Sequence, residues 1–462
     1  MNLHDIVIVG AGPAGVRAAE TLVQAGLKPT VVDEAPRAGG QIYRRPPEGF
    51  VRTSRQLYGF SSRKADDVHR SFERLAGRIV HLPATLAWNC DGRRLDLLTD
   101  GRHHGKSFSH LILCTGANDR MLPFPGWLLP GVYTLGAAQV ALKTQGCVLG
   151  GRVVLMGSGA LLYLLAYQYA KAGAEIAAVL DTASLANQFG ALADLGRQPL
   201  AFGRGLVLVA WLRSRGVRVI TGVRDVAVSG DERVRGVAWR SDGREHRIAC
   251  DALATGFNLR AETQLADLAG CAFEFDCVQR QWLPRRDAAG RSSVAGVYLA
   301  GDGAHLLGAD AAELAGRRAA LALLEDAGEP TCAGEGPRLE RALLRHAGFQ
   351  RGLQRAFALP VAWLHECADD LVICRCENVR AGDLRAAAGA GRASEINRLK
   401  AMTRVGMGRC QGRLCAGAAA EILAHATGQA IEDVGRLRAQ PPIKPISLMS
   451  RQPDRPPTGE PS

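Results

Sequence analysis

The sequence predicts an α/β protein with two doubly wound, Rossmann-type dinucleotide-binding domains, followed by a small helical C-terminal domain. Two strand–glycine–helix–strand units, one at the N-terminus and one beginning at Arg152, predict the two large domains. Four cysteines between Cys374 and Cys415 predict the third. The length of 462 residues agrees with this division, because such a chain exceeds one ordinary hydrophobic core.

The first unit carries the glycine pattern of a dinucleotide site. An apolar strand runs into Gly10, Gly12 and Gly15, a helix follows, and the next strand ends at Asp33. Gly10 permits the tight turn, Gly12 lets backbone approach a pyrophosphate, and Gly15 lets helix and strand pack closely. The helix N-terminus attracts phosphates, and Asp33 is placed to accept hydrogen bonds from an adenosine ribose. A glycine-rich turn without a ligand is the alternative interpretation.

The second unit is a weaker ligand site. It keeps Gly157 and Gly159 but has Leu162 where close helix–strand packing favours a small residue. Asp181 at the end of its second strand would suit an NAD ribose and repel the extra phosphate of NADP. The sequence therefore disfavours NAD(P) and predicts a degenerate second domain.

A third strand-and-glycine segment follows the second unit. Alternating runs predict a small antiparallel meander in each domain. The later run from Gly296 then ends in Gly301-Asp302-Gly303, and a helix is predicted from about Asp310 to Glu325. Another βα step in the second domain would explain this segment, and so would a return to the first domain.

Four of the twelve cysteines form a set. Cys374-Arg-Cys376 is separated by 33 residues from a Cys-x₄-Cys pair, Cys410 and Cys415. Four thiolates can hold zinc or an iron–sulfur cluster, and structural zinc usually prefers Cys-x₂-Cys pairs. The spacing favours a cluster, with zinc and free thiols as alternatives.

Charge and hydropathy exclude several classes of function. The net charge is +12, but the basic residues are dispersed and no nucleic-acid recognition motif accompanies them. No apolar run reaches the roughly 18 residues of a membrane span, and no cleavable signal precedes the first strand. We therefore expect a cytoplasmic protein without nucleic-acid partners. The basic charge leaves peripheral contact with the anionic inner face of the membrane open.

The first 325 residues resemble the glutathione-reductase-like flavoproteins. Gly39-Gly40-Gln41 after the acidic residue, the Thr-Gly pairs ending at Gly116 and Gly256, and the late Gly301-Asp302 carry this resemblance. It implies FAD, with the late strand returning to the first domain and its aspartate reaching the ribityl chain and pyrophosphate. The family's redox disulfide after the Gly-Gly pair is absent. The implied FAD-binding residues are Gly10, Gly12, Gly15, Asp33, Gly40, Gln41, Gly116, Gly301 and Asp302.

The cysteine module is similar to the bacterioferritin-associated-ferredoxin-like (BFD-like) [2Fe–2S] domain. The match extends from Val372 through the glycines before Cys410. It implies a [2Fe–2S] cluster, with glycines that let backbone N–H groups turn toward its sulfur atoms. The implied ligands are Cys374, Cys376, Cys410 and Cys415.

The whole chain resembles the larger, alpha- or A-type subunits of bacterial dye-linked amino-acid dehydrogenases. This family includes the A-type subunit of opine oxidase, the B-type subunit of hydrogen cyanide synthase and the alpha subunit of hydroxyproline dehydrogenase. The resemblance implies an electron-transfer subunit that relays electrons from a partner flavoprotein to an acceptor. The partner would be an FAD-containing beta subunit of the D-amino-acid or sarcosine oxidase type, and a small ferredoxin-like subunit is compatible. An NAD(P)H-dependent flavin reductase and a non-catalytic protein with a structural cofactor are the alternatives.

No acid–base pair stands out in the sequence. His305, just after the Gly301-Asp302 motif, is the best single candidate for handling a proton near the flavin, although a packed histidine is the more ordinary interpretation. The expected divisions are an FAD domain at 1–120 and 285–330, a second Rossmann domain at 121–284, a helical linker at 331–370, a [2Fe–2S] domain at 371–430 and a tail at 431–462.

Overall fold

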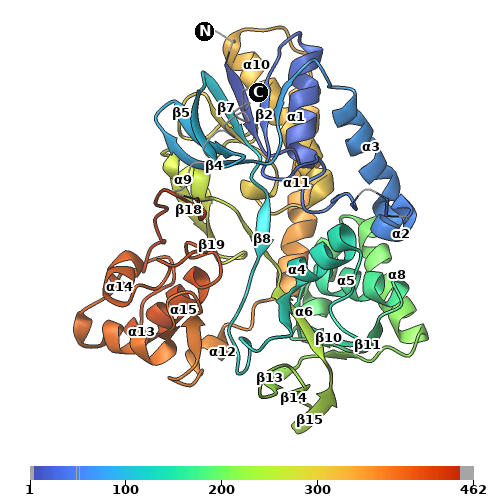
Figure 1. The fold of residues 1–462 in the computed structure, drawn as a ribbon, viewed down its shortest axis with the longest axis vertical. Helices are drawn as coiled ribbons and strands as arrows, with labels where there is room; N and C mark the ends of the chain where they lie inside the picture. Colours follow the sequence, from blue (N-terminus) through green and yellow to red (C-terminus); the bar gives the residue numbers. More distant parts are fainter. Residues whose placement is uncertain (1–4, 48, 51, 448–462) are drawn as a thin grey trace, which may run out of the picture.

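A computed structural model describes residues 5–47, 49–50 and 52–447. Figure 1 shows three parts: an upper α/β part, a lower right α/β part, and a C-terminal module at the lower left. The strand β8 (Ala117–Asp119) runs between the upper and lower parts.

The upper part is built on a five-stranded parallel sheet in the order β20-β7-β1-β2-β3. All four residues of β1 are buried, because both faces of the sheet are covered. Ile6 and Ile8 pack with α1 and α10. Val7 and Val9 point to the other face and pack with the antiparallel meander β4-β5-β6. The elements are β1 (Ile6–Val9), α1 (Pro13–Gln24), β2 (Thr30–Val32), α2 (Ser54–Tyr58), η1 (Gly59–Ser61), α3 (Ser62–Glu73), β3 (Val80–Leu82), β4 (Thr85–Asp91), β5 (Arg94–Thr99), β6 (Arg102–Ser107), β7 (His110–Leu113), β20 (Val297–Leu299), η3 (Gly301–Gly303) and α10 (Ala309–Ala327).

The late strand β20 belongs to this first sheet. It pairs in parallel with β7, with Tyr298 opposite Ile112. The helix α10 that follows lies against α1, where a Cβ on Gly316 would stand 1.9 Å from the Ala14 carbonyl oxygen. This pairing supports the predicted return of residues 285–330 to the first domain, whose exact boundaries remain a proposal.

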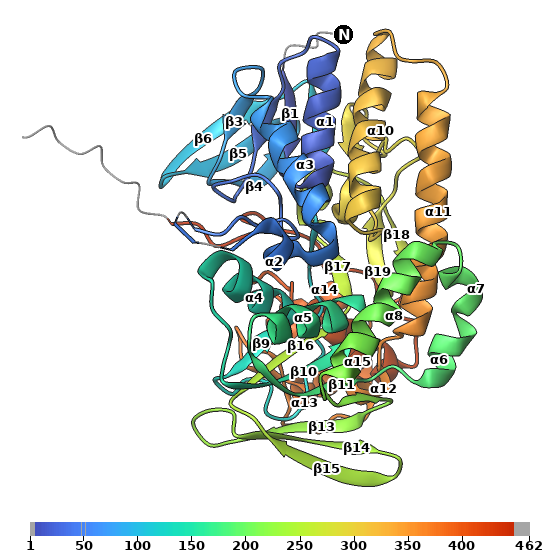
Figure 2. The same ribbon diagram turned by 90° about the vertical axis from the view of Figure 1, so that its right-hand side faces the viewer.

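The lower right part repeats the plan. Its parallel sheet has the order β12-β11-β10-β16-β9, and a second meander, β13-β14-β15, lies beneath it (Figure 2). The elements are β9 (Val132–Thr134), α4 (Leu135–Val140), the π-helix η2 (Ala141–Gln145), β10 (Arg152–Ser158), α5 (Ala160–Lys171), β11 (Glu175–Asp181), α6 (Leu185–Gly190), α7 (Leu192–Leu195), α8 (Pro199–Ser214), β12 (Val219–Thr221), β13 (Arg224–Ser229), β14 (Gly236–Ser241), β15 (Arg244–Ala249) and β16 (Ala252–Phe257).

Two crossing strands connect the α/β parts. β8 pairs antiparallel with β17, with Asn118 opposite Arg260. A short helix and a hairpin then lead back to the first sheet. These elements are β17 (Leu259–Ala261), α9 (Gln264–Leu268), β18 (Phe273–Asp276) and β19 (Gln281–Pro284).

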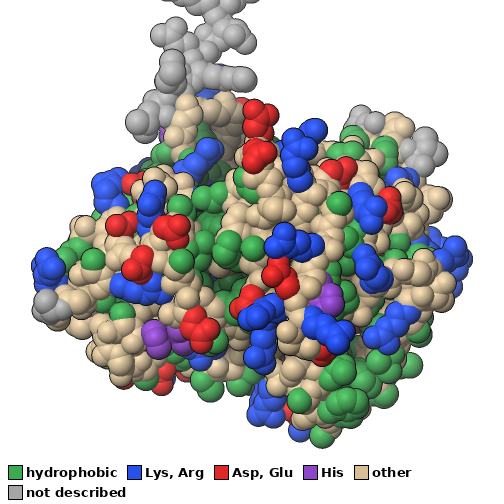
Figure 3. All heavy atoms as spheres, turned by 90° about the horizontal axis from the view of Figure 1, so that it is seen from below, with side chains coloured by type: hydrophobic (Ala, Val, Ile, Leu, Met, Phe, Trp, Pro, Cys, Tyr) green, Lys and Arg blue, Asp and Glu red, His purple; other side chains and the backbone are tan. Residues whose placement is uncertain are grey.

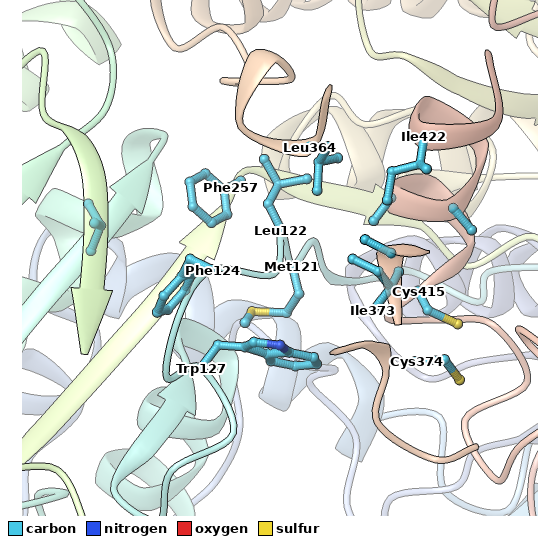
Figure 4. Packing of buried hydrophobic residues seen from close by; sticks show 14 of the residues in the cluster. Met121, Leu122, Phe124, Trp127, Phe257, Leu364, Ile373, Cys374, Cys415 and Ile422 are labelled. Carbon is cyan, nitrogen blue, oxygen red and sulfur yellow. The ribbon is translucent and has the colours of Figure 1, made fainter. Parts of the chain in front are cut away.

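The C-terminal module shares one hydrophobic core with the second sheet. Met121 and Trp127 from the crossing segment pack in the same cluster as Ile373 and Cys415 of the module (Figure 4). The Trp127 indole N–H also donates to the Val372 carbonyl at 2.9 Å. The continuous core fixes the cysteine loops relative to the crossing strands. The linker helix α11 (Glu335–Ala356) packs beside α10 of the first domain, with Leu339 in its core. The elements of the module are α12 (Ala362–His365), β21 (Val372–Cys374), β22 (Val379–Arg380), α13 (Ala381–Ala388), η4 (Gly389–Gly391), α14 (Ile396–Thr403) and α15 (Ala416–Thr427).

The described part of the predicted tail is packed. Ile443 is 4% exposed and lies in the core of the first domain, and its N–H donates to the Trp88 carbonyl at 3.1 Å. Residues 431–447 therefore tie the module back to the first domain. The rest of the expected tail, 448–462, lies outside the described residues.

Candidate functional site

The turn after β1 forms a cradle of backbone. Gly10 has φ +104°, and a Cβ there would stand 2.3 Å from the Cys114 carbonyl oxygen. A Cβ on Gly15 would stand 1.8 Å from the Gly10 oxygen, so only glycine lets α1 start this close to the strand. A Cβ on Gly40 would lie 2.9 Å from the Gly12 Cα, so the Gly-Gly pair faces the turn. No described side chain caps α1, which leaves its N-terminal N–H groups for an anion. The cradle fits a pyrophosphate.

The acidic residue at the end of β2 closes one side of this cradle. The Asp33 carboxylate accepts hydrogen bonds from the backbone N–H groups of Ala11 and Ala35, the latter at 2.6 Å. Burial raises the pKa of Asp33, and the two N–H groups oppose that shift. The carboxylate is thus held beside Gly12, where a ribose hydroxyl can reach it.

The late motif meets the cradle from the other side. A Cβ on Gly301 would lie 2.9 Å from the Ala14 Cβ at the start of α1. One Asp302 carboxylate oxygen accepts from the N–H groups of Leu307 and Gly308, each at 3.0 Å. Burial raises the pKa of Asp302. The carboxylate therefore organises the loop before α10.

Two further predicted residues differ in their surroundings. Gly116 adjoins this motif, because a Cβ on Gly303 would lie 3.1 Å from the Gly116 nitrogen. Gln41 is exposed, and its side-chain oxygen accepts from Arg44, with Nε at 3.0 Å. The structure thus brings the glycines and both aspartates together around the start of α1 and leaves the Gln41 side chain at the surface.

His305 lies in a small buried site beside Arg286, a residue that sequence reasoning missed. Its Nε2 is 2.8 Å from the Gln279 side-chain nitrogen. Burial, together with the nearby Arg286 guanidinium, lowers the pKa of His305 to about 4. Arg286 lines the same small cavity as Asp302, and no sequence motif marks it. The imidazole is therefore neutral at physiological pH and suited to hydrogen bonding rather than to carrying a positive charge.

His305→Asn is expected to leave the pH dependence of electron transfer unchanged between about pH 5 and pH 8, because a group that is already neutral does not titrate there. Stopped-flow rates of flavin reduction and reoxidation across this range measure the effect. A pH step that is present in the wild type and absent in the variant would show that His305 titrates in this range.

The second glycine turn differs from the first in its third position and in the surroundings of its acidic residue. Leu162 is fully buried at the third glycine position. The Tyr163 hydroxyl donates to Asp181 at 2.5 Å, and the Ala183 N–H donates to its other oxygen at 2.9 Å. Asp33 is held by two backbone N–H groups, whereas Asp181 accepts from a side-chain hydroxyl and is fully buried. This arrangement agrees with the prediction that the second domain is degenerate.

The free energy of unfolding of the wild type is expected to fall as the pH rises from about 4 to about 7. Asp181→Asn should abolish this fall. Burial raises the pKa of Asp181 to about 7, whereas the unfolded carboxyl ionises near its ordinary value of about 3.9. The folded state therefore binds more protons in this window, and the free energy of unfolding falls as the pH rises. Relative to the variant, the wild type should lose roughly 4 kcal/mol across it, because a pKa difference of about three units is worth about 1.4 kcal/mol per unit. Urea unfolding at several pH values measures this, with the exposed Asp231→Asn as control. Parallel curves for wild type and D181N would contradict the expectation.

The four module cysteines meet in a series of contacts. The Cys415 thiol forms hydrogen bonds with the sulfurs of Cys374 and Cys410, and Cys410 forms another with Cys376. Hydrogen bonding from Cys415 lowers the pKa of Cys374 to about 6 and that of Cys410 to about 5, helped by backbone N–H groups. In the part of the chain described, no set of three or more His, Cys, Asp or Glu side chains already surrounds one metal position. Four neighbouring sulfurs, two of them readily ionised, fit the donor set of a [2Fe–2S] cluster.

The backbone around these cysteines is shaped to present N–H groups. Cys374 accepts from the N–H groups of Gly406 and Glu377. Left-handed backbone in the cysteine loops turns successive N–H groups to one side, and such concave sites suit anionic sulfur. The residues with left-handed φ are Asn378, Arg404, Gly406, Gln411 and Gly412.

A buried ion pair joins the cluster loop to the crossing strands. The Arg413 Nε donates to the Glu262 carboxylate at 2.6 Å, and its Nη1 donates to the Cys410 carbonyl at 3.3 Å. The Glu262 N–H donates to the Gly116 carbonyl at 2.9 Å. Burial raises the pKa of the Glu262 carboxyl, but the Arg413 guanidinium outweighs this effect, so the pKa is lowered overall. Sequence reasoning missed this pair, because neither residue belongs to a motif.

Comparisons with known proteins agree with this geometry. The family model of pyridine nucleotide-disulphide oxidoreductases matches residues 4–325, and that of the BFD-like [2Fe-2S] binding domain matches 372–425. The A-type subunit of opine oxidase from Rhizobium meliloti is 36% identical over 97% of this chain and 87% of its own. Hydrogen cyanide synthase subunit HcnB of Pseudomonas aeruginosa is 35% identical over 98% of this chain and 99% of its own. The crystal structure of L-proline dehydrogenase from P. horikoshii shares the fold, with a TM-score of 0.70 and 20% identity over 96% of this chain and 78% of that chain.

The fold and the two sites define an oxidoreductase of the two-domain flavoprotein class, with FAD and a [2Fe–2S] cluster as its cofactors. More closely, the chain belongs to the family that includes HcnB of hydrogen cyanide synthase and the A-type subunit of opine oxidase, and it is one component of a heteromeric enzyme. The predicted fold class, family and cofactors are confirmed. Among the described residues, no helix combines the length and hydropathy needed to cross a bilayer.

Proposed function

We propose that this chain is the electron-relay subunit of a heteromeric amino-acid or imino-acid dehydrogenase. It would receive electrons from a partner flavoprotein and pass them through its own FAD and [2Fe–2S] cluster to an acceptor. The relatives named for opine oxidation and hydrogen cyanide synthesis support substrates with a C–N bond, of the opine, hydroxyproline or glycine type.

One observation carries the proposal: the short hydrogen-bonded path between the two cofactor sites. It runs from Gly116 through Glu262 and Arg413 to the carbonyl of Cys410. The Glu262 and Arg413 side chains are only 11% and 13% exposed, so the pair is held in place. A fixed, short separation is what single-electron transfer between cofactors requires. Bound together, FAD and the cluster convert two-electron transfer into single-electron steps.

The residues of this chain have positioning roles in the proposed relay. The glycine turn and Asp33 hold the dinucleotide end of the flavin, and Asp302 shapes the loop before α10. The neutral His305 keeps its side chain in a hydrogen bond with Gln279.

An exposed apolar surface on the second domain supports a partner. We define the apolar face as the exposed side chains of α6, α7 and α8, and Figure 3 shows hydrophobic side chains gathered at the lower right with basic groups beside them. Leu200 is 80% exposed and Phe189 is 69% exposed, and only Leu208 and Leu212 of α8 are buried. Apolar groups gathered in this way mark interaction sites. We propose that the apolar face meets the oxidase-like beta subunit.

The relay is tested by purifying this chain alone and together with its oxidase-like partner subunit. The isolated chain should hold FAD and iron yet oxidise no amino acid, and the complex should do so with dye as acceptor. Leu200→Glu should reduce co-purification at least about tenfold without loss of FAD or iron, because it buries a charge in the interface. Met402→Glu, on the exposed side of the module, is the control. An isolated chain that oxidises amino acids would overturn the proposal.

The NAD(P)H-dependent reductase alternative is tested in the same preparation. The second glycine turn argues against it, because Leu162 stands at its third glycine position and the Tyr163 hydroxyl donates to Asp181. Mixing the oxidised chain with NADH or NADPH should leave the flavin absorbance unchanged on the timescale of turnover. Rapid bleaching would favour the reductase instead.

A further inference from the structure

A large cleft lies between the crossing strands, the β18–β19 hairpin and the C-terminal module. About 1080 Å³ of empty space, part of it open to solvent, lies among its lining residues. Apolar side chains form much of its wall. They include Phe273, Phe275, Trp282, Leu359, Val361 and Leu437.

The buried guanidinium of Arg120 and the partly buried guanidinium of Arg260 line this cleft without a carboxylate in ion-pair contact. Arg120 is 8% exposed, and its Nη1 donates to the Gln279 carbonyl at 2.7 Å. Arg260 donates from Nη1 to the Arg413 carbonyl at 3.0 Å and more weakly to that of Gly412 at 3.4 Å. Within the described residues, no Asp or Glu oxygen lies in ion-pair distance of either guanidinium. Their hydrogen-bond partners are therefore neutral carbonyl groups, and the nearest acidic groups, Glu262 for Arg260 and Glu421 for Arg120, act only from beyond ion-pair distance.

Other arginines of the same cleft are fully paired. Arg280 binds Glu421 through two hydrogen bonds of 2.7 Å. Arg436 binds Asp267, with one bond at 2.8 Å. Arg280 and Arg436 thus each have a carboxylate partner, whereas Arg120 and Arg260 have none within ion-pair distance.

The unpaired guanidiniums are energetically costly as they stand. Burial, together with the neighbouring Arg260, lowers the pKa of Arg120 to about 9. Burial also lowers the pKa of Arg260. A buried charge is normally paired or binds a counter-ion. Two further buried polar atoms on cleft residues, Arg413 Nη2 and Gln264 Oε1, have no hydrogen-bond partner within the described chain.

We propose that this cleft binds a small organic oxyanion, with its carboxylate or phosphate on Arg120 and Arg260 and its apolar body against the aromatic wall. Guanidinium groups are suited to both kinds of oxyanion. Phe275 and Trp282 lie edge to face with ring centroids 5.6 Å apart and supply a flat apolar surface. The site is separate from the glycine cradle of the FAD and is not assigned by the family matches.

Calorimetric titration of the full chain with its cofactors tests the site. The probes are phenylphosphate and phenylacetate, with benzyl alcohol as the uncharged analogue. At least one anion should bind at least about tenfold more tightly than benzyl alcohol, since a charge-assisted hydrogen bond is involved. The stronger of the two anions identifies the headgroup as phosphate or carboxylate.

Variants localise the binding. Arg120→Gln and Arg260→Gln should each weaken the anion at least about tenfold, while benzyl alcohol is unaffected. Arg240→Gln, which removes an exposed charge on β14, should change nothing. Unchanged FAD and iron content shows that a variant is folded.

Three results would overturn the proposal. The first two are equal affinity for benzyl alcohol and the anions, and anion binding that is unaffected in both Arg120→Gln and Arg260→Gln. Absence of binding up to millimolar anion would do the same. The comparison of probes needs no variant, so it decides even if both substitutions prevent folding. Because the readout is binding, failure here leaves the proposed electron relay untouched, and failure of the relay leaves this site testable.

Discussion

Cys410→Ser is expected to remove the iron from the purified chain while leaving its flavin in place. Cys410 contacts both Cys376 and Cys415, so its loss breaks the series of four sulfurs at its centre. A serine hydroxyl stays protonated and is a poor ligand for iron–sulfur clusters. Iron per chain should fall at least about tenfold, since even indirect disturbance of a metal site costs that much. Electron transfer beyond the flavin should stop.

Iron analysis, the cluster absorbance and the flavin-to-protein ratio measure the effect after anaerobic purification. Cys332→Ser changes an exposed cysteine outside the set and serves as the control. If C410S kept its iron and its visible spectrum, the assignment of the four ligands would be wrong. Loss of flavin together with iron would mean that C410S is unfolded. In that case Gly408→Ala and Gly417→Ala test the ligand assignment.

Two glycines of the module form a matched pair. A Cβ on Gly408 would stand 2.2 Å from the Cβ of Cys376, whereas one on Gly417 would meet nothing within 4 Å. Gly408→Ala must push the Cys376 loop aside, so its iron content should follow that of C410S. Gly417→Ala lies in α15 and should keep its iron. Comparing the iron content of the two variants distinguishes displacement of the Cys376 ligand from general damage to the domain.

Much of this site could be predicted from local sequence. Gly10, Gly12 and Gly15 act within one turn, and their spacing relative to the strand and helix already states the geometry. The cysteine pairs are equally local, because each lies within one loop. Short-range patterns of this kind survive in a single sequence without knowledge of the tertiary fold.

The rest depends on contacts between segments far apart in the chain. Glu262 and Arg413 are separated by 151 residues, and neither has a neighbour that marks it. Gly316 lies in an ordinary Ala/Leu/Arg helix, and only its crossing of α1 explains why a side chain is not tolerated. The return of Ile443 to the first domain was likewise hidden in a segment expected to be a tail. Each depends on how the domains pack, which composition and periodicity do not encode.

The second glycine turn shows a different limit. Its first two glycines and Asp181 look like a nucleotide site in sequence, and Leu162 alone raises doubt. The structure adds Tyr163, whose hydroxyl donates to the Asp181 carboxylate. A tyrosine in a helix has many ordinary uses, so its role could not be inferred from its position.

Gly15→Ala is expected to weaken FAD binding at least about tenfold and to lower the thermal stability of the chain. The new methyl group would stand 1.8 Å from the Gly10 oxygen and 2.9 Å from its carbonyl carbon, which are backbone atoms and cannot rotate away. α1 must then move outward, and its N-terminal N–H groups leave the position that receives the pyrophosphate. Overpacking of this severity costs at least about 1–3 kcal/mol, so flavin affinity should fall by at least about tenfold.

Gly203→Ala is the matched control, because it makes the same chemical change inside α8, where a Cβ meets nothing within 4 Å. Helix propensity predicts that G203A stabilises the chain by about 0.5–1 kcal/mol, the opposite sign to G15A. Flavin content after gel filtration and the melting temperature measure both variants, and iron content shows whether the module stays folded. A G15A chain that retained stoichiometric FAD would mean that the flavin does not lie on this turn. Loss of FAD with iron retained would instead show that the two sites form independently and that the rigid crossing segment, rather than the cofactors, sets their separation.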